Sequence, residues 1–211
     1  GDHRDLHVRS RRQRQMCIRD SLEIEISEDQ IKELEDFTFT HLHNHSQYSI
    51  LQSTTQISNL IEKCGEFDMH AVALTDTGNM MAAFHFESAA NKYNQKIRAE
   101  RDKAEKENEP YSKKEILPII GCEFNVCVDM KNHSQKDNGS KVVLLAKNKA
   151  GYQNLIKLAS YAYTSGMYYG PRIGKEILLQ YKSDLIVLSG GVYGEIPNLV
   201  LAVGGPQAEI Y

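Results

Sequence analysis

Apolar runs and helically spaced apolar residues alternate along the chain from residue 37 onward. A first strand is predicted at residues 37–40, leading into the segment 41–45. Continuous apolar runs, typical of buried strands, follow at residues 71–76, 116–123, 142–146 and 185–189. Helical spacing of apolar residues occurs at residues 57–64, 80–90 and 152–163. This alternation predicts an α/β fold whose parallel strands are covered by helices, either a β/α barrel or an open doubly wound sheet.

Two polar segments interrupt this pattern. Residues 91–115 are dense in charges of both signs and contain Pro110. Because proline ends a helix, we expect an exposed extension of the preceding helix that stops before Pro110. Residues 129–140 contain Asn138-Gly139 and are predicted to form a loop.

The first 36 residues differ in composition from the rest of the chain. Residues 1–20 contain six arginines and show no apolar periodicity. We interpret them as a disordered or extraneous leader, with a basic arm that touches DNA as the alternative. Residues 21–36 are acidic, and a short helix is expected at residues 27–34. The folded domain is therefore predicted to span residues 37–211.

The composition limits the class of protein. The chain has 211 residues, of which 41% are hydrophobic and 25% are charged, with a net charge of -3. This predicts one sizeable core and gives no electrostatic case for nucleic-acid binding by the chain itself. No apolar run approaches the roughly 18 residues that span a bilayer, so a cytoplasmic location is expected. The four cysteines, Cys17, Cys64, Cys122 and Cys127, are scattered and are expected to be reduced.

Three histidines in five residues are the strongest chemical signal. His41, His43 and His45 occupy alternate positions. On a strand, alternate side chains point to the same side, so the three imidazoles can converge on a single point. Imidazole is a common ligand of zinc, manganese and iron. The alternative is a surface strand whose histidines are solvated.

Two further predicted strand ends carry carboxylates. Asp76 ends the run 71–76, and Glu123 ends the run 116–123. In a β/α barrel these ends meet at one edge, where the carboxylates and imidazoles can hold one or two divalent metals that polarise a phosphoryl oxygen. Alternatively, Asp76 is a turn or helix-cap residue, and Glu123 pairs with a lysine such as Lys141.

Six motifs carry a resemblance to a known family. They are THLHNHSQYS at residues 40–49, ALTDTGNM at 73–80, LPIIGCE at 117–123, LLAKNKAGYQNL at 144–155, PRI at 171–173 and LSGG at 188–191. From residue 39 to about residue 197 the chain resembles the PHP (polymerase and histidinol phosphatase) domain. Within that family it is similar to the domain at the N-terminus of bacterial replicative DNA polymerase III alpha subunits.

The resemblance implies a fold and a site. The implied fold is a distorted barrel of seven strand-helix units, of which this chain supplies about five, so an incomplete barrel is expected. The metal ligands of the family correspond to His43, His45 and Glu123, with zinc or manganese as the implied metal, and Asp76 and His41 line the same site.

The sequence departs from the family at four further site positions. Gln52 stands where active members have aspartate, and Thr77 where they have histidine. Lys141 lies near another histidine position and Gly191 near a cysteine position. An amide, a hydroxyl and an ammonium do not replace anionic or imidazole ligands, so a degenerate site without catalytic residues is expected.

The resemblance also implies partners. The favoured hypothesis is a non-catalytic scaffold that supports a DNA-directed DNA polymerase, contacts other polymerase subunits and docks a proofreading exonuclease. Polymerase chemistry, its magnesium ions and its DNA contacts would lie outside this chain. The alternatives are a metal-dependent 3′-5′ exonuclease or phosphoesterase, and a stand-alone PHP phosphatase. Because the barrel would be open, the chain by itself is predicted to be poorly stable or to aggregate.

Overall fold

The structure is a computed structural model that describes residues 39–131, 133–134 and 137–203. These residues belong to a compact unit that begins at Phe39. The leader predicted at residues 1–36, its short helix and Cys17 lie outside the described residues. The other three cysteines, Cys64, Cys122 and Cys127, are free, and all three are buried.

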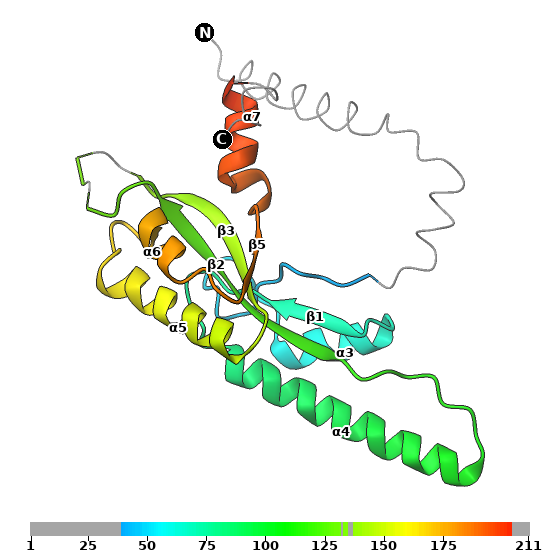
Figure 1. Ribbon diagram of the computed structural model, residues 1–211. Helices are drawn as coiled ribbons and strands as arrows, with labels where there is room; N and C mark the ends of the chain where they lie inside the picture. Colours follow the sequence, from blue (N-terminus) through cyan, green and yellow to red (C-terminus); the bar gives the residue numbers. More distant parts are fainter. Residues whose placement is uncertain (1–38, 132, 135–136, 204–211) are drawn as a thin grey trace. The chain divides into compact units, whose positions relative to one another are not determined.

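A five-stranded open sheet forms the centre of the fold (Figure 1). Its strands are β1 (Ala71–Leu74), β2 (Leu117–Cys127), β3 (Ser140–Ala146), β4 (Ile173–Gly174) and β5 (Leu185–Leu188). The order is β1-β2-β3-β5, and β4 pairs with the end of β2. Strand β2 runs parallel to β1 and β4, whereas β3 runs antiparallel to both β2 and β5.

The prediction of an all-parallel sheet is therefore wrong for two of the four strand pairs. Between β2 and β3 the described residues form no helix. A parallel return requires a crossover connection of a dozen or more residues, usually a helix, whereas an antiparallel return needs only a loop. The sheet is mixed for this reason.

The helices confirm most of the sequence expectations. They are α3 (Ile57–Glu66), α4 (Ala83–Glu107), α5 (Lys149–Thr164), α6 (Lys175–Gln180) and α7 (Glu195–Val203), with a 3-10 turn η1 (Gly191–Tyr193). Helix α4 continues through the charged segment and ends before Pro110, as predicted; Asn108 follows it in the left-handed conformation. The short elements β4, α6, η1 and α7 were not predicted. None of the described helices is long and apolar enough to span a bilayer.

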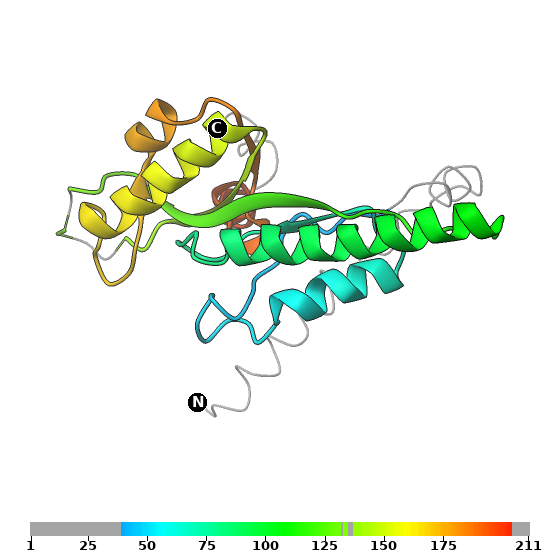
Figure 2. The same ribbon diagram turned by 90° about the horizontal axis from the view of Figure 1, so that it is seen from below.

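One face of the sheet is covered by helices. Figure 1 shows α3, α4 and α5 on the same side of the sheet, and Figure 2 shows α3 beside α4. Val72 and Leu74 of β1 pack with Phe86 of α4 and with α3 in one apolar cluster. Phe124 and Leu144 pack against α5 in a second cluster. These clusters contain most of the buried apolar residues and anchor the strands.

The opposite face has a much smaller apolar cluster, formed by Ala73, Val143 and Leu145. Glu123 lies directly opposite Val143 in the β2–β3 register. Directly opposite residues in an antiparallel pair point to the same side of the sheet. Glu123 therefore projects from the face that the large clusters do not occupy.

The histidine-bearing segment runs along this sheet without forming a regular strand. The Ala73 N–H donates to the His41 carbonyl at 2.9 Å, and the Thr75 N–H donates to the Asn44 carbonyl at 2.8 Å. These two bonds hold residues 41–44 alongside β1. The first two residues of the predicted strand, 37 and 38, lie outside the described residues.

Candidate metal centre

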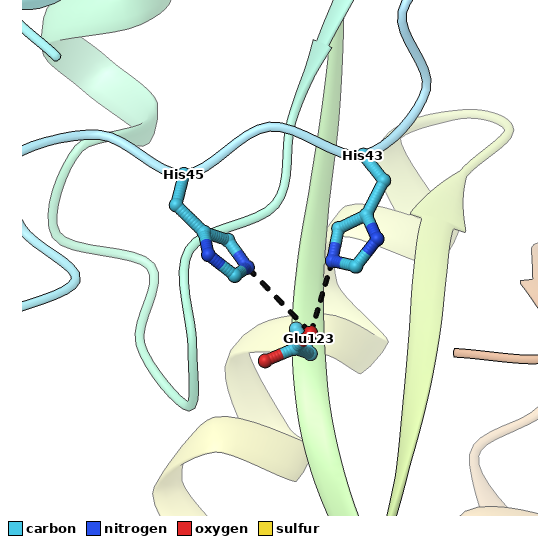
Figure 3. Close-up of side chains that lie close together, drawn as sticks. All are labelled: His43, His45 and Glu123. Atoms are coloured by element: carbon cyan, nitrogen blue, oxygen red, sulfur yellow. Dashed lines mark hydrogen bonds and ion pairs between the residues drawn. The ribbon is translucent and has the colours of Figure 1, made fainter. Parts of the chain in front are cut away.

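Two histidines and one glutamate converge on the sheet face just described (Figure 3). Nε2 of His43 lies 2.9 Å from Oε2 of Glu123, and Nε2 of His45 lies 3.6 Å from the same oxygen. The three ligand atoms lie within 4.8 Å of one another. They come from segments about 80 residues apart. Residues 41–44 pair with β1, and β1 pairs with β2, so β1 brings the two segments close together.

Alternation along the extended segment explains why two of the histidines meet. His43 and His45 are two residues apart, and both rings turn toward Glu123. His41 does not join them: its ring packs edge-on against Phe39 with 4.7 Å between ring centroids. The structure thus places His41 outside the cluster.

The second oxygen of Glu123 has different neighbours. Lys141 Nζ donates to Oε1 at 2.5 Å, and Thr77 Oγ1 donates to it at 2.9 Å. Gln52 lies 2.7 Å from the same Thr77 hydroxyl. Gln52, Thr77 and Lys141, three of the positions at which the sequence is expected to depart from the family, therefore all lie at the site as neutral or positively charged groups.

Glu123 is almost fully buried, with 1% of its side chain exposed. Burial alone would raise the pKa of Glu123. The neighbouring His45 imidazole, the Lys141 ammonium and the Thr77 hydroxyl outweigh burial and lower the pKa to about 2. The carboxylate is consequently ionised at neutral pH and carries the negative charge of the site.

Asp76 plays a different part from the one expected of a residue lining the site. Its buried carboxylate accepts hydrogen bonds from the Ser46 N–H, the Ser46 hydroxyl and the Ser49 hydroxyl, each at 2.6 Å. Asp76 thus faces the loop that follows His45 and fixes that loop. Sequence reasoning missed the two serines, because nothing in the local pattern links them to a residue about thirty positions away.

Gly191 lies in η1, in the turn after β5, and as a glycine it has no side chain that could bind a metal. Its neighbour Gly190 has a φ of 75° and packs against β3, where a Cβ atom would lie 1.9 Å from the Lys141 carbonyl oxygen. Tyr193, which sequence reasoning also missed, places its ring centroid 6.0 Å from Lys141 Nζ. The turn after β5 therefore packs around Lys141.

The donor set can hold one metal ion. Two imidazoles and one carboxylate are ligands that zinc uses in proteins. The buried Nε2 of His45 has no hydrogen-bond partner, and a metal would satisfy it. Opposite an ionised Glu123, however, Nε2 of His43 must carry a proton, which a metal would have to displace. Lys141 already supplies a positive charge to the same carboxylate.

Comparison with known proteins identifies the class. The sequence matches the PHP domain family over residues 41–210, so the chain belongs to that family.

Its relatives include alpha subunits of DNA polymerase III. The chain is 36% identical over 176 residues to the DNA polymerase III subunit alpha of Treponema pallidum, covering 82% of this chain and 13% of that protein. It is 38% identical over 168 residues to the subunit of Borreliella burgdorferi, covering 78% and 13%. The subunit of Thermus aquaticus is 34% identical over 170 residues, covering 77% and 12%. The match falls in the N-terminal region of these subunits, and the chain spans only 12–13% of their length.

Proposed function

We propose that this chain is the PHP-domain portion of a bacterial replicative DNA polymerase III alpha subunit and that the domain is a non-catalytic scaffold within it. Family membership and the names of the relatives support the first half of the proposal. The parent protein would extend primers on a DNA template in the cytoplasm, using magnesium bound by regions outside this chain. The domain would support the polymerase and dock a proofreading exonuclease and other subunits.

One observation carries the second half of the proposal. Lys141 donates to Glu123 at 2.5 Å, at the position where a metal-dependent hydrolase needs a carboxylate free to bind a cation. The neutral Thr77 hydroxyl contacts the same carboxylate, and the neutral Gln52 amide contacts Thr77. In the described residues the cluster has three groups that could bind a metal, and only one of the three, Glu123, is a carboxylate. A single negative charge that already has a positive partner is a poor site for two-metal phosphoryl chemistry.

The open sheet belongs, in this proposal, to a distorted barrel of the PHP type. Strand β5 ends the order β1-β2-β3-β5 with no strand beyond it in the described residues. Further strand-helix units of the parent protein would pair with this edge.

The proposal is tested with the full-length protein and a 3′-labelled DNA primer. We expect no removal of 3′ nucleotides with zinc, manganese or magnesium, and normal primer extension. A metal-dependent 3′ nuclease activity that His43→Ala abolishes, while primer extension persists, would overturn the scaffold assignment. His41→Ala is the matched control, because His41 lies outside the cluster.

A metal-dependent 3′-5′ exonuclease or phosphoesterase is the second candidate. The buried Nε2 of His45 favours it, because this atom has no hydrogen bond, lies 3.6 Å from Oε2 of Glu123, and proteins rarely leave a buried polar atom unsatisfied. Elemental analysis of the purified full-length protein discriminates the two candidates. Stoichiometric zinc or manganese that is lost in His45→Ala, together with metal-dependent removal of 3′ nucleotides, would favour the hydrolase, whereas bound metal without that activity would not.

A further inference from the structure

We propose that the Lys141 ammonium is the resident cation of this site: it neutralises Glu123 and excludes a divalent ion. This inference deepens the scaffold proposal and rests on it. Its starting point is the β2–β3 register, in which Glu123 pairs with Val143 and Asn125 pairs with Lys141. Glu123 and Lys141 are therefore diagonal neighbours on one sheet face, a spacing that a long side chain can bridge.

The two oxygens of Glu123 are divided between two sets of donors. Oε1 accepts from Lys141 at 2.5 Å and from Thr77 at 2.9 Å. Oε2 lies 2.9 Å from His43 Nε2. The short contacts that described residues make to this carboxylate thus all come from donor groups, and a metal ion would compete with them.

The charges favour a monovalent cation. Glu123 is the one carboxylate in the cluster formed by described residues. Asp76, the other carboxylate at these strand ends, is engaged by Ser46 and Ser49. Lys141 and Glu123 sum to zero charge, whereas adding a divalent ion beside the ammonium would leave two uncompensated positive charges near a buried residue. Charges in such a place are costly unless they are paired.

The fold holds Lys141 in place from the other side. The turn after β5 contacts the Lys141 backbone so closely that only a glycine fits at position 190. The Tyr193 ring lies within 6.0 Å of the ammonium, at the outer limit of a cation–π contact. The Lys141 side chain is 27% exposed and forms a contact between β2, β3 and this turn. The ion pair is consequently part of the packing around the site.

The test is zinc binding by the full-length protein, measured by competition with a chromophoric chelator. We expect no zinc binding at the His43 site in the wild type. Wild type and His43→Ala should therefore bind the same amount of zinc with the same affinity. Lys141→Met removes the charge and keeps most of the side-chain volume. It should bind one zinc ion at least about tenfold more tightly than wild type, and adding His43→Ala should abolish the gain. Lys141→Arg should behave as wild type.

Lys92→Met is the matched control, because Lys92 lies on the exposed surface of α4, away from the site. One His43-dependent zinc ion in the wild type would overturn the inference, and so would a folded Lys141→Met protein that binds no more zinc than wild type. If Lys141→Met fails to fold, the comparison of wild type with His43→Ala decides alone. Nuclease activity is measured on the same preparations: its appearance in wild type contradicts the scaffold proposal, whereas inert bound zinc contradicts only the role of Lys141.

Discussion

The two faces of the sheet bury different kinds of side chain. On the helix-covered face, Phe86, Phe124 and Leu144 are buried among apolar side chains, and burial of apolar area supplies the stability. On the opposite face, a small apolar cluster adjoins Glu123 and Lys141, a charged pair whose carboxylate is equally buried. Burial stabilises the first set directly, whereas for the second it costs desolvation free energy, which is offset only as long as each charge keeps its partner.

This difference indicates where the domain tolerates change. A substitution on the helix-covered face should alter stability without altering ion binding. A substitution at the ion pair should alter both, because the same ammonium balances the carboxylate and occupies the place of a metal. Amide hydrogen exchange or melting of the full-length protein separates these effects.

The largest effect is expected from Phe86→Ala on the helix-covered face. Phe86 is fully buried between α4 and the sheet. Truncating it should lower the local opening free energy of β1 and α4 by about 4 kcal/mol, from lost burial and the cavity left behind. Phe84→Ala on the same helix is the control, because Phe84 is 74% exposed and its loss should cost within about 0.5 kcal/mol. Similar costs for both would contradict the assignment of this core.

Asp76→Ala should have the next largest effect, confined to the histidine loop. The substitution leaves the buried Ser46 N–H and the Ser49 hydroxyl without an acceptor. The loop should lose about 3 kcal/mol of protection, measured by hydrogen exchange of peptides covering residues 44–52. Ser53→Ala, which removes one bond to the His45 carbonyl, should cost about 1 kcal/mol. An unchanged loop in Asp76→Ala would show that Asp76 does not hold it.

The third largest effect is expected from low pH, which should weaken the ion pair between Glu123 and Lys141. The pKa of Glu123 is lowered from an ordinary value of 4.5 to about 2 in the folded protein. A lowered folded pKa contributes stability that is fully present above the ordinary value and is lost as pH falls through the folded value. The melting-temperature advantage of wild type over Glu123→Gln should therefore shrink between about pH 5 and pH 2. A difference that does not depend on pH would contradict the lowered pKa.

Much of this architecture was readable from the sequence. The continuous apolar runs of β1 and β5 and the helical spacing of apolar residues at the start of α4 were clear signals, although β5 is half exposed and not fully buried as its run predicts. Strand direction did not, because an apolar run looks the same in a parallel and in an antiparallel pair. The loop between β2 and β3, which was predicted without a helix, was the available signal for an antiparallel turn. Strand β4 has two residues and offers no pattern.

The site could be predicted only in part, because local spacing identifies some of its residues and long-range contacts decide the others. His43 and His45 share a side by alternation, and Glu123 lies near the end of a predicted strand, so local spacing pointed to them. The partnership of Lys141 with Glu123 depends on the register of β3, and sequence analysis offered it only as an alternative. The serine contacts of Asp76 depend on a long-range approach of two loops, which no local spacing encodes.

The smallest effect on stability is expected at the edge strand β5. Ile186 and Val187 are 45% and 55% exposed, and no strand pairs with their outer edge in the described residues. The isolated 211-residue chain should aggregate on warming, and Val187→Lys should reduce light scattering while changing stability by under about 0.5 kcal/mol. Val128→Lys, in the exposed loop after β2, is the control that should leave scattering unchanged. A cooperative transition of a monomeric wild-type chain would contradict this expectation.

A double-mutant cycle between Lys141 and Glu123 tests the central claim most directly. The full-length wild type, Lys141→Met, Glu123→Gln and the double variant are compared by hydrogen exchange of peptides from β2 and β3. A buried ion pair predicts a coupling free energy of about 2 kcal/mol, so that the second substitution costs little once the first is made. Additive effects, with a coupling below about 0.3 kcal/mol, would show that the two residues do not form the charge pair on which this account depends.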